Sequence, residues 1–254
     1  MTSSGNPGRF LVHDLDPAVR VRVTRPMPDL ASKLDGSVEA LWQAARARVE
    51  AGGAGRLFNG RVFSADAITP GEITGHVTEF RRIVAQMEDP ALFDALGLRP
   101  LAVCGVLCCA DGVPVGRRHA AAVYQPGMWQ LPPAGSVDPG AVDPDGRVDL
   151  RAQVLTELAE ELGVAASEVG GVRPLCVVEH PGSHVSDVGI AIATELSGAQ
   201  VLAAHRASGN GEYDPLVFVP FGEIAAFVTR VGAGLVPPAV EFLRRAGLLG
   251  GEAA

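Results

Sequence analysis

The stretch LRAQVLTELAEELGV (150–164) decides how the rest of the chain is interpreted. Its three glutamates, Glu157, Glu160 and Glu161, are spaced i, i+3 and i+4. On a helix, where each residue turns by about 100°, they lie within an arc of about 100° on one face. Carboxylates packed so closely repel one another unless a cation lies among them, and Mg²⁺ prefers oxygen ligands. The pattern therefore predicts a helix that binds a metal ion, with a solvated acidic helix face as the alternative.

The composition limits the classes of partner. The chain has 254 residues, of which 47% are hydrophobic and 20% charged, which is enough apolar material for a sizeable core. Its net charge of -8 argues against nucleic acid and anionic membranes as partners, because basic patches bind both. We find neither the pattern of a signal peptide nor an apolar run approaching about 18 residues. These observations predict a cytoplasmic protein.

The first part of the chain, residues 9–98, is predicted to form an α/β extension. The alternating VRVRV at 19–23 indicates a strand. Residues 37–51 have the apolar spacing of an amphipathic helix with Ser37 as its N-cap, and a second helix is expected at 78–88.

The second part, residues 99–249, is predicted to form the larger domain. LAVCGVLCCADGVPVGRRH (101–119) indicates two strands joined by an Asp-Gly turn, hence a β-hairpin. Further strands are expected at 174–180, 188–196 and 216–221, and helices at 221–228 and 236–249. The polar stretch between the last two of these strands is predicted to be a loop. Strands flanked by a few helices make an α/β (α+β) fold with a mixed sheet.

The order of hairpin, WQLPPAG (129–135) and ELAEELGV (157–164) resembles the Nudix hydrolases, whose signature is G-x5-E-x7-R-E-U-x-E-E-x-G-U, with U a bulky aliphatic residue. The second segment matches the last eight positions of the signature, and Gly135 stands where its glycine is expected. Two departures are present. Thr156 replaces the arginine, and Gly135 and Thr156 are 21 positions apart (156 minus 135) where the signature has 14. The lengthening includes the acidic segment 142–149.

The resemblance implies a Nudix-type α/β/α sandwich with a mixed sheet, preceded by the N-terminal extension. It also implies a site, in which Mg²⁺, with Mn²⁺ as the alternative ion, bridges a diphosphate. The implied metal ligands are Glu157, Glu160 and Glu161; Glu160, Glu161 and Glu212 are the implied catalytic residues; Arg118 and Gly135 are the implied substrate-binding residues. The chemistry is coherent, since a metal ion neutralises phosphate charge and lowers the pKa of the attacking water.

The identity of the general base and of the group that replaces the arginine stays open at this point. Glu212 lies in the polar loop before the strand at 216–221, where Asp214 is a rival, and His180 is a further candidate. The signature arginine would orient a glutamate or the loop, and Thr156 cannot make that ion pair. Arg147 or Arg151 is the candidate replacement.

The short segment Phe58-Asn59-Gly60, the size of the extension and the enlarged box without the arginine resemble one Nudix branch, the UDP-glucose and UDP-galactose pyrophosphatases. That branch implies a small-molecule substrate, a UDP-sugar, cleaved to UMP and a sugar 1-phosphate. ADP-ribose, another nucleotide or a prenyl diphosphate is the alternative substrate. A Nudix domain that binds a nucleotide without cleaving it is the alternative function, favoured by Thr156 and the insertion. A homodimer is the assembly considered.

Overall fold

The computed structural model describes residues 10–51, 57–120, 122 and 124–250. The start of the predicted extension at residue 9 lies outside them. Contacts divide the chain into two units. Unit 1 comprises Met1–Ala102, Ser136–Asp149 and Val177–Asp187, and unit 2 comprises Val103–Gly135, Leu150–Cys176 and Val188–Ala254. The chain therefore passes between the units several times, and the predicted boundary between residues 98 and 99 stays a prediction.

A five-stranded sheet runs in the order β1-β10-β11-β5-β8. Its strands are β1 (Leu11–Asp14), β10 (Val169–Glu179), β11 (Ser186–Thr194), β5 (Leu101–Cys108) and β8 (Ala134–Ser136). The four strands other than β1 begin in one unit and end in the other. Their buried valine, isoleucine and leucine residues belong to the core, among them Val106, Val177 and Ile190.

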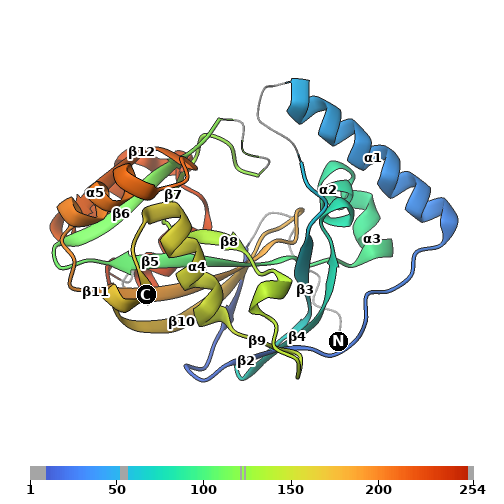
Figure 1. Ribbon diagram of the computed structural model, residues 1–254, viewed down its shortest axis with the longest axis horizontal. Coiled ribbons are helices and arrows are strands. Elements are labelled where there is room, and N and C mark those ends of the chain that lie inside the picture. Colours follow the sequence, from blue (N-terminus) through green and yellow to red (C-terminus); the bar gives the residue numbers. More distant parts are fainter. Residues whose placement is uncertain (1–9, 52–56, 121, 123, 251–254) are drawn as a thin grey trace. The chain divides into compact units, whose positions relative to one another are not determined.

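Unit 1 contains a mixed four-stranded sheet in the order β3-β4-β2-β9. The strands are β2 (Arg20–Val23), β3 (Arg61–Ile68), β4 (Glu72–Glu79) and β9 (Arg147–Val148). Helices α1 (Ser32–Ala51) and α2 (Phe80–Glu88) pack on each other through Trp42, Ala45 and Val84, and the Trp42 ring meets Phe80 edge-on at 6.2 Å (Figure 1). A short helical turn, η1 (Pro90–Leu92), leads into α3 (Phe93–Leu96).

Two predictions in this region are corrected. Helix α1 begins at Ser32 rather than Ser37, and the Ser37 hydroxyl donates to the Lys33 carbonyl at 3.2 Å within the helix instead of capping it. The helix expected at 78–88 begins only at Phe80, because the preceding residues form the end of β4, a strand that the sequence analysis missed.

The acidic segment 142–149 is part of the unit 1 sheet. Its strand β9 pairs with β2 in antiparallel register, with Val148 opposite Val21 and Arg147 opposite Arg22. A turn forms at Gly146, with a φ of 77° and a hydrogen bond from its N–H to the Asp143 carbonyl at 2.9 Å. The end of this segment, Arg147–Val148, is therefore held in the sheet by strand pairing.

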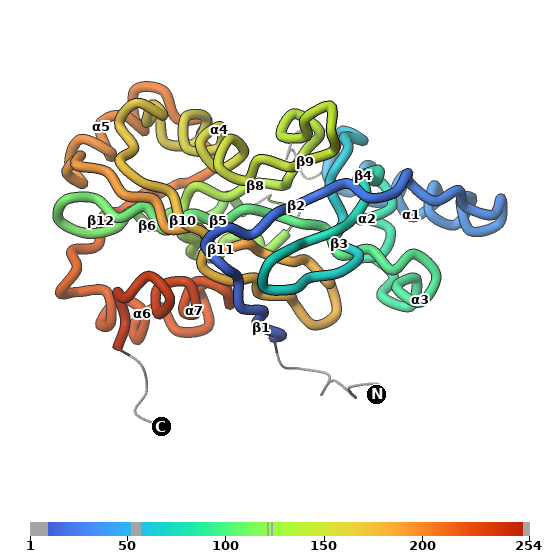
Figure 2. Tube along the Cα trace, turned by 90° about the horizontal axis from the view of Figure 1, so that it is seen from below, coloured from blue at the N-terminus to red at the C-terminus, as the bar shows by residue number. Residues whose placement is uncertain are grey.

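Unit 2 contains a three-stranded antiparallel sheet in the order β12-β6-β7, formed by β12 (Tyr213–Pro220), β6 (Gly112–Arg118) and β7 (Trp129–Gln130). Helices α4 (Leu150–Leu162) and α5 (Gly198–Ser208) lie on one side of the strands, and α6 (Ile224–Val231) and α7 (Pro238–Arg245) lie on the other (Figure 2). Short helical turns are η2 (Pro139–Ala141) in unit 1 and η3 (Ala166–Glu168), η4 (Phe221–Glu223) and η5 (Gly232–Gly234) in unit 2. This α/β/α layering agrees with the predicted mixed α/β fold, which is confirmed.

Two further corrections concern unit 2. The turn at Gly112 forms, with the Cys109 N–H donating to its carbonyl at 2.9 Å, but β5 and β6 belong to different sheets and are not the predicted hairpin. The polar stretch predicted as a loop contains α5, which begins with a capping box in which Ser197 and Gln200 bond each other's backbone N–H. No helix in the described part of the chain is long and apolar enough to cross a membrane.

Candidate active site

The three glutamates of helix α4 differ in how far they are exposed to solvent. Val154, Leu158 and Leu162 recur every four residues and are fully buried, so they define the face that packs on the core. Glu161 lies beside that face and is 0% exposed, Glu157 is half-buried and Glu160 is exposed. The predicted helix is confirmed.

Helix α4 ends just before Gly163, and its last carbonyl groups are bonded by residues in and just after α5. Gly163 has a φ of 67°, the left-handed conformation of a C-terminal cap. The Asn210 N–H donates to the Glu160 carbonyl at 3.1 Å, and the Glu161 carbonyl lies 2.9 Å from the Nδ1 of His205. These bonds satisfy carbonyl groups that the helix itself leaves unpaired, and they fix the backbone that carries two of the glutamates.

The Glu161 carboxylate is buried, and only one of its two oxygens has a hydrogen-bond partner among the described residues. Its Oε2 accepts a hydrogen bond from the Ala134 N–H at 3.0 Å, whereas its buried Oε1 has no hydrogen-bond partner among the described residues. Burial, followed by the negative charges of Glu212 and Glu157, raises its pKa well above the ordinary value, and the Ala134 N–H only partly opposes this. A cation bound beside the carboxylate would favour its ionised form and so oppose that shift.

Glu157 is held between the loop and its own helix. A Cβ built on Gly135 would lie 2.0 Å from its Oε1 and 2.1 Å from its Cδ, so only glycine allows the carboxylate to lie against this backbone. On the other side, the Nε2 of Gln153 donates to Oε1 at 2.8 Å. The two ends of the predicted motif, Gly135 and the glutamate helix, thus meet despite their long separation in sequence.

Arg118 and Glu212 form the other charged part of the site. The Arg118 Nη1 lies 3.5 Å from the Glu212 Oε1, and its Nε donates to the Tyr124 carbonyl at 3.1 Å. Its Nη1 also donates to the Oε1 of the buried Gln130, which accepts a further bond from the Tyr213 hydroxyl at 3.4 Å. Arg118 and Glu212 both act electrostatically on Glu161, so the structure brings these predicted residues together.

Several residues here were not foreseen. Gln153, Gln130 and Tyr213 carry the hydrogen bonds that organise the site, and burial together with Glu161 and Glu212 raises the pKa of the Tyr213 hydroxyl well above its ordinary value. The signal for Gln153 was its position four residues before Glu157, the spacing at which helical side chains meet. Arg147, a predicted replacement for the arginine, lies instead on β9 in unit 1.

The carboxylates of α4 are the candidate ligands for a divalent metal ion. In the part of the chain that the structure describes, no group of three or more His, Cys, Asp or Glu side chains is gathered closely enough to hold a metal ion. The available atoms nevertheless have the right chemistry, because Glu157 and Glu161 offer carboxylate oxygens and the Glu161 Oε1 is buried and unpartnered. Glu157 and Glu161 therefore fit Mg²⁺ by donor type.

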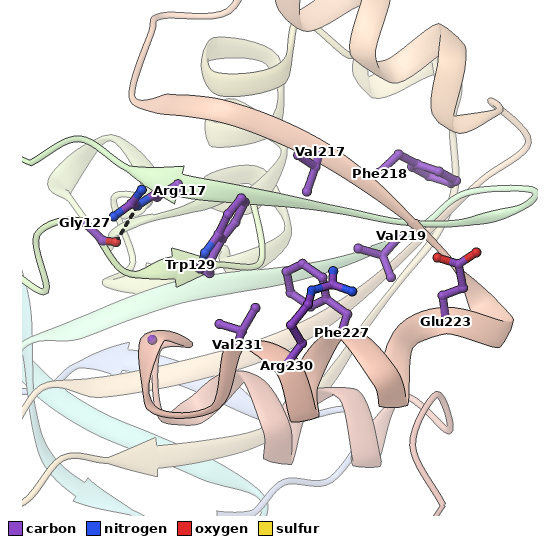
Figure 3. Close-up of a pocket in the computed structure, with 11 residues that line it drawn as sticks. Arg117, Gly127, Trp129, Val217, Phe218, Val219, Glu223, Phe227, Arg230 and Val231 are labelled. Carbon is purple, nitrogen blue, oxygen red and sulfur yellow. Dashed lines mark hydrogen bonds between the residues drawn. The ribbon is translucent and has the colours of Figure 1, made fainter.

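A cavity of about 490 Å³ lies on the other face of the three-stranded sheet. In the β6–β7 ladder Arg117 is opposite Trp129, so both point away from the face that carries Arg118 and Gln130. Trp129 meets Phe227 of α6 edge-on at 5.7 Å, and the Arg230 guanidinium lies 5.2 Å from the Phe227 ring centroid (Figure 3). We do not assign the cavity to the glutamate site, because strand alternation puts it on the opposite face.

A second charged cluster lies in unit 1, around Glu179 at the end of β10. Its Oε1 lies 3.1 Å from the Nδ1 of His184 and 3.3 Å from the Nε of Arg99, and its Oε2 lies 3.7 Å from His13. Burial alone would raise the pKa of Glu179, but the two neighbouring histidines and the Arg99 charge outweigh it and lower the pKa to about 2. His180, the further candidate for a base, is buried here against Asp187, with its Nε2 2.7 Å from Oδ2.

Comparison with known proteins gives only remote likenesses. No family model and no curated protein matches the chain. Among solved structures, it is similar to a MutT protein from Methanosarcina mazei Go1, at 19% identity and a TM-score of 0.38 over 58% of this chain and 93% of that one. It is also similar to a hydrolase of the Nudix family from Clostridium perfringens, at 14% identity and a TM-score of 0.37 over 60% and 99%.

A further likeness is to a bifunctional NMN adenylyltransferase/ADP ribose pyrophosphatase from Francisella tularensis, complexed with AMP and a manganese ion. Identity is 11% and the TM-score 0.39, over 66% of this chain and 48% of that one. Values at this level do not assign a family or an activity to the chain, so any assignment has to rest on the site residues.

Proposed function

We propose that the protein is a Mg²⁺-dependent pyrophosphohydrolase of the Nudix type, which cleaves the diphosphate of a nucleoside diphosphate linked to a second group. The observation that carries the proposal is the contact between Gly135 and the Glu157 carboxylate. A glycine is needed there for a steric reason, and it is the glycine that the Nudix signature requires. A solvated acidic helix face would give no reason for a loop backbone to close on one of its glutamates.

The residues have distinct parts in this proposal. Glu157, Glu160 and Glu161 hold Mg²⁺, or Mn²⁺ in its place. When bound, the ion supplies charge neutralisation at the diphosphate and a lower pKa for the attacking water. Glu212 accepts the proton of that water, and Arg118 exchanges its ion pair with Glu212 at 3.5 Å for contact with a phosphate oxygen.

For the substrate we propose a UDP-sugar, cleaved to UMP and a sugar 1-phosphate. The support is the sequence likeness to the UDP-sugar branch at residues 58–60 and the enlarged box without its arginine. ADP-ribose, another nucleotide and a prenyl diphosphate are the competing substrates.

The test is a panel of nucleotide sugars, ADP-ribose, dinucleotides and prenyl diphosphates with Mg²⁺, in which released monophosphates are converted to phosphate by an added phosphatase. We expect release from UDP-glucose or a related UDP-sugar, and a loss of release in Glu161→Gln. Glu195→Gln changes an exposed glutamate in unit 2 and is the matched control. Release from the other substrates alone would refute the UDP-sugar assignment, and full activity of Glu161→Gln would refute the site.

A second candidate function is nucleotide binding without cleavage. It is favoured by Thr156, whose hydroxyl donates to the Ala152 carbonyl of its own helix at 3.1 Å and therefore does not orient a glutamate. Calorimetric binding of a nucleotide without any phosphate release across the panel would establish this function in place of hydrolysis.

A further inference from the structure

We infer that Gln153 is a positioning residue, which orients Glu157 for the metal ion in a chain that lacks the arginine of the signature. The inference rests on the proposed metal site. It concerns a residue that lies outside the signature positions and whose side-chain amide bonds to Glu157.

The geometry places Gln153 one helical turn before Glu157, on the same face of α4. Its Nε2 donates to the Glu157 Oε1 at 2.8 Å, a normal length for such a bond. Gln153 is only 4% exposed, so its side chain is confined by packing and can hold a partner in place. A solvent-exposed glutamine would lack that rigidity.

The bond acts together with Gly135. The backbone of Gly135 bounds the Glu157 carboxylate on one side and the Gln153 amide bonds it on the other, so its rotation is restricted from two directions. An ionised carboxylate has about four lone-pair sites. The amide of Gln153 bonds to one oxygen, Oε1.

The side-chain amide of Gln153 is a neutral hydrogen-bond donor, and its lack of charge matters for the binding of a cation. A guanidinium at this distance would bring a positive charge against the carboxylate and would oppose the arrival of a divalent cation. The amide of Gln153 fixes the direction of the carboxylate without cancelling its charge. The neighbouring Glu161 Oε1 is buried and has no hydrogen-bond partner among the described residues, so it is a second carboxylate oxygen that a cation could bind.

The experiment measures the binding of Mn²⁺ to the full chain by calorimetry, in the absence of substrate. The principal variant is Gln153→Met, which keeps the length and the buried volume of the side chain and removes the donor. Gln43→Ala is the control, because the Gln43 Nε2 donates to the Glu39 Oε1 at 2.6 Å, also four residues apart on a helix but in unit 1. Thermal unfolding is recorded for each variant.

We expect Gln153→Met to weaken Mn²⁺ binding by about tenfold, the lower end of the effect of removing such a supporting bond, and Gln43→Ala to bind as the unchanged protein does. In the hydrolysis assay, Gln153→Met should need more Mg²⁺ for half-maximal rate and recover most of its kcat at saturating Mg²⁺. A purely structural role would lower the melting temperature and leave the Mn²⁺ affinity unchanged, and that result would overturn the inference.

The outcomes also separate this inference from the proposed function. Normal Mn²⁺ binding by Gln153→Met, with hydrolysis intact in the unchanged protein, would overturn the inference alone. Weakened binding by the variant, with no hydrolysis by either protein, would support the inference and remove the proposed activity. An unchanged protein that binds no Mn²⁺ would overturn both.

Discussion

Replacing Gly135 by alanine tests the contact on which the site depends. The added Cβ would lie 2.0 Å from Oε1, 2.1 Å from Cδ and 2.6 Å from Oε2 of Glu157. The carboxylate must therefore move by more than about 1 Å to reach an ordinary carbon–oxygen contact, which begins near about 3.4 Å. Because Glu157 is a half-buried, flexible side chain, the side chain rather than the backbone should give way.

The two consequences should differ greatly in size. Loss of the bond from Gln153 costs about 1 kcal/mol, and a strained rotamer adds about 1 kcal/mol, so the free energy of unfolding should fall by about 2 kcal/mol. Displacement of a catalytic group by about 1 Å lowers turnover by about 100-fold. We expect Gly135→Ala to fold normally and to lose nearly all Mg²⁺-dependent hydrolysis.

The assay pairs urea unfolding with initial rates on the best substrate of the panel. Gly171→Ala is the control, since nothing lies within 4 Å of the added Cβ and the residue also belongs to unit 2. Full activity of Gly135→Ala would show that the position of Glu157 is irrelevant to the reaction. Failure to fold would show that the carboxylate cannot move aside, which also contradicts the reasoning.

Three further predictions concern stability. The pKa of Glu179 is about 2 in the folded protein against about 4.3 when unfolded. Its contribution of about 3 kcal/mol to the free energy of unfolding is therefore present above about pH 5 and is lost as the pH falls towards 2. Urea titrations should show that the stability of Glu179→Gln falls less steeply with acid than that of the unchanged protein, and equal pH slopes for the two would refute this prediction. Gly163→Ala should lower the free energy of unfolding by about 2 kcal/mol, because Gly163 has a φ of 67° and an added Cβ would lie 2.8 Å from the Ala204 carbonyl oxygen. An unchanged midpoint of urea unfolding would contradict this. Trp42→Ala, in the contact between α1 and α2, should cost about 3–5 kcal/mol in the same measurement, and a loss below about 1 kcal/mol would place Trp42 outside the core.

Elements whose signals are local were predicted well. The 150–164 stretch forms α4 because its leucine and valine spacing is helical and Gly163 supplies a left-handed cap, both of which are properties of neighbouring residues. The turn at Gly112 formed for the same reason, but the pairing of β5 and β6 did not follow. A turn is decided by its own residues, whereas the partner of a strand is decided by distant segments.

The missed elements lacked a strong local pattern. In β4, EITGHVTE, polar and apolar residues are buried alike, and His76 and Thr78 are as covered as Ile73, so no clean alternation identifies a strand. In α5, GAQVLAAHRAS, Val201 is the one large apolar residue that is fully buried among the described residues of that helix. Its capping box was the available signal.

The residue types of the candidate site could be predicted from the sequence, but the hydrogen bonds among them could not. The signature placed Gly135 and the glutamates, since both are fixed by chemistry that a motif records. The bonds from Gln153 and Ala134 depend on which side chains the fold buries beside the carboxylates. Such neighbours become visible only when the helix is packed against the loop.

The segment 136–149 has a consequence for how the protein can be divided. Gly135 and Leu150 are consecutive unit 2 residues on either side of a segment whose strand β9 is hydrogen-bonded to β2. A longer free loop would add conformational freedom to the chain that enters α4, and strand pairing removes it. Deletion of the N-terminal residues would leave β9 without its partner and would release the entry to the glutamate helix. We therefore expect a protein without its N-terminal residues to lose the order of α4 before it loses the fold of unit 2.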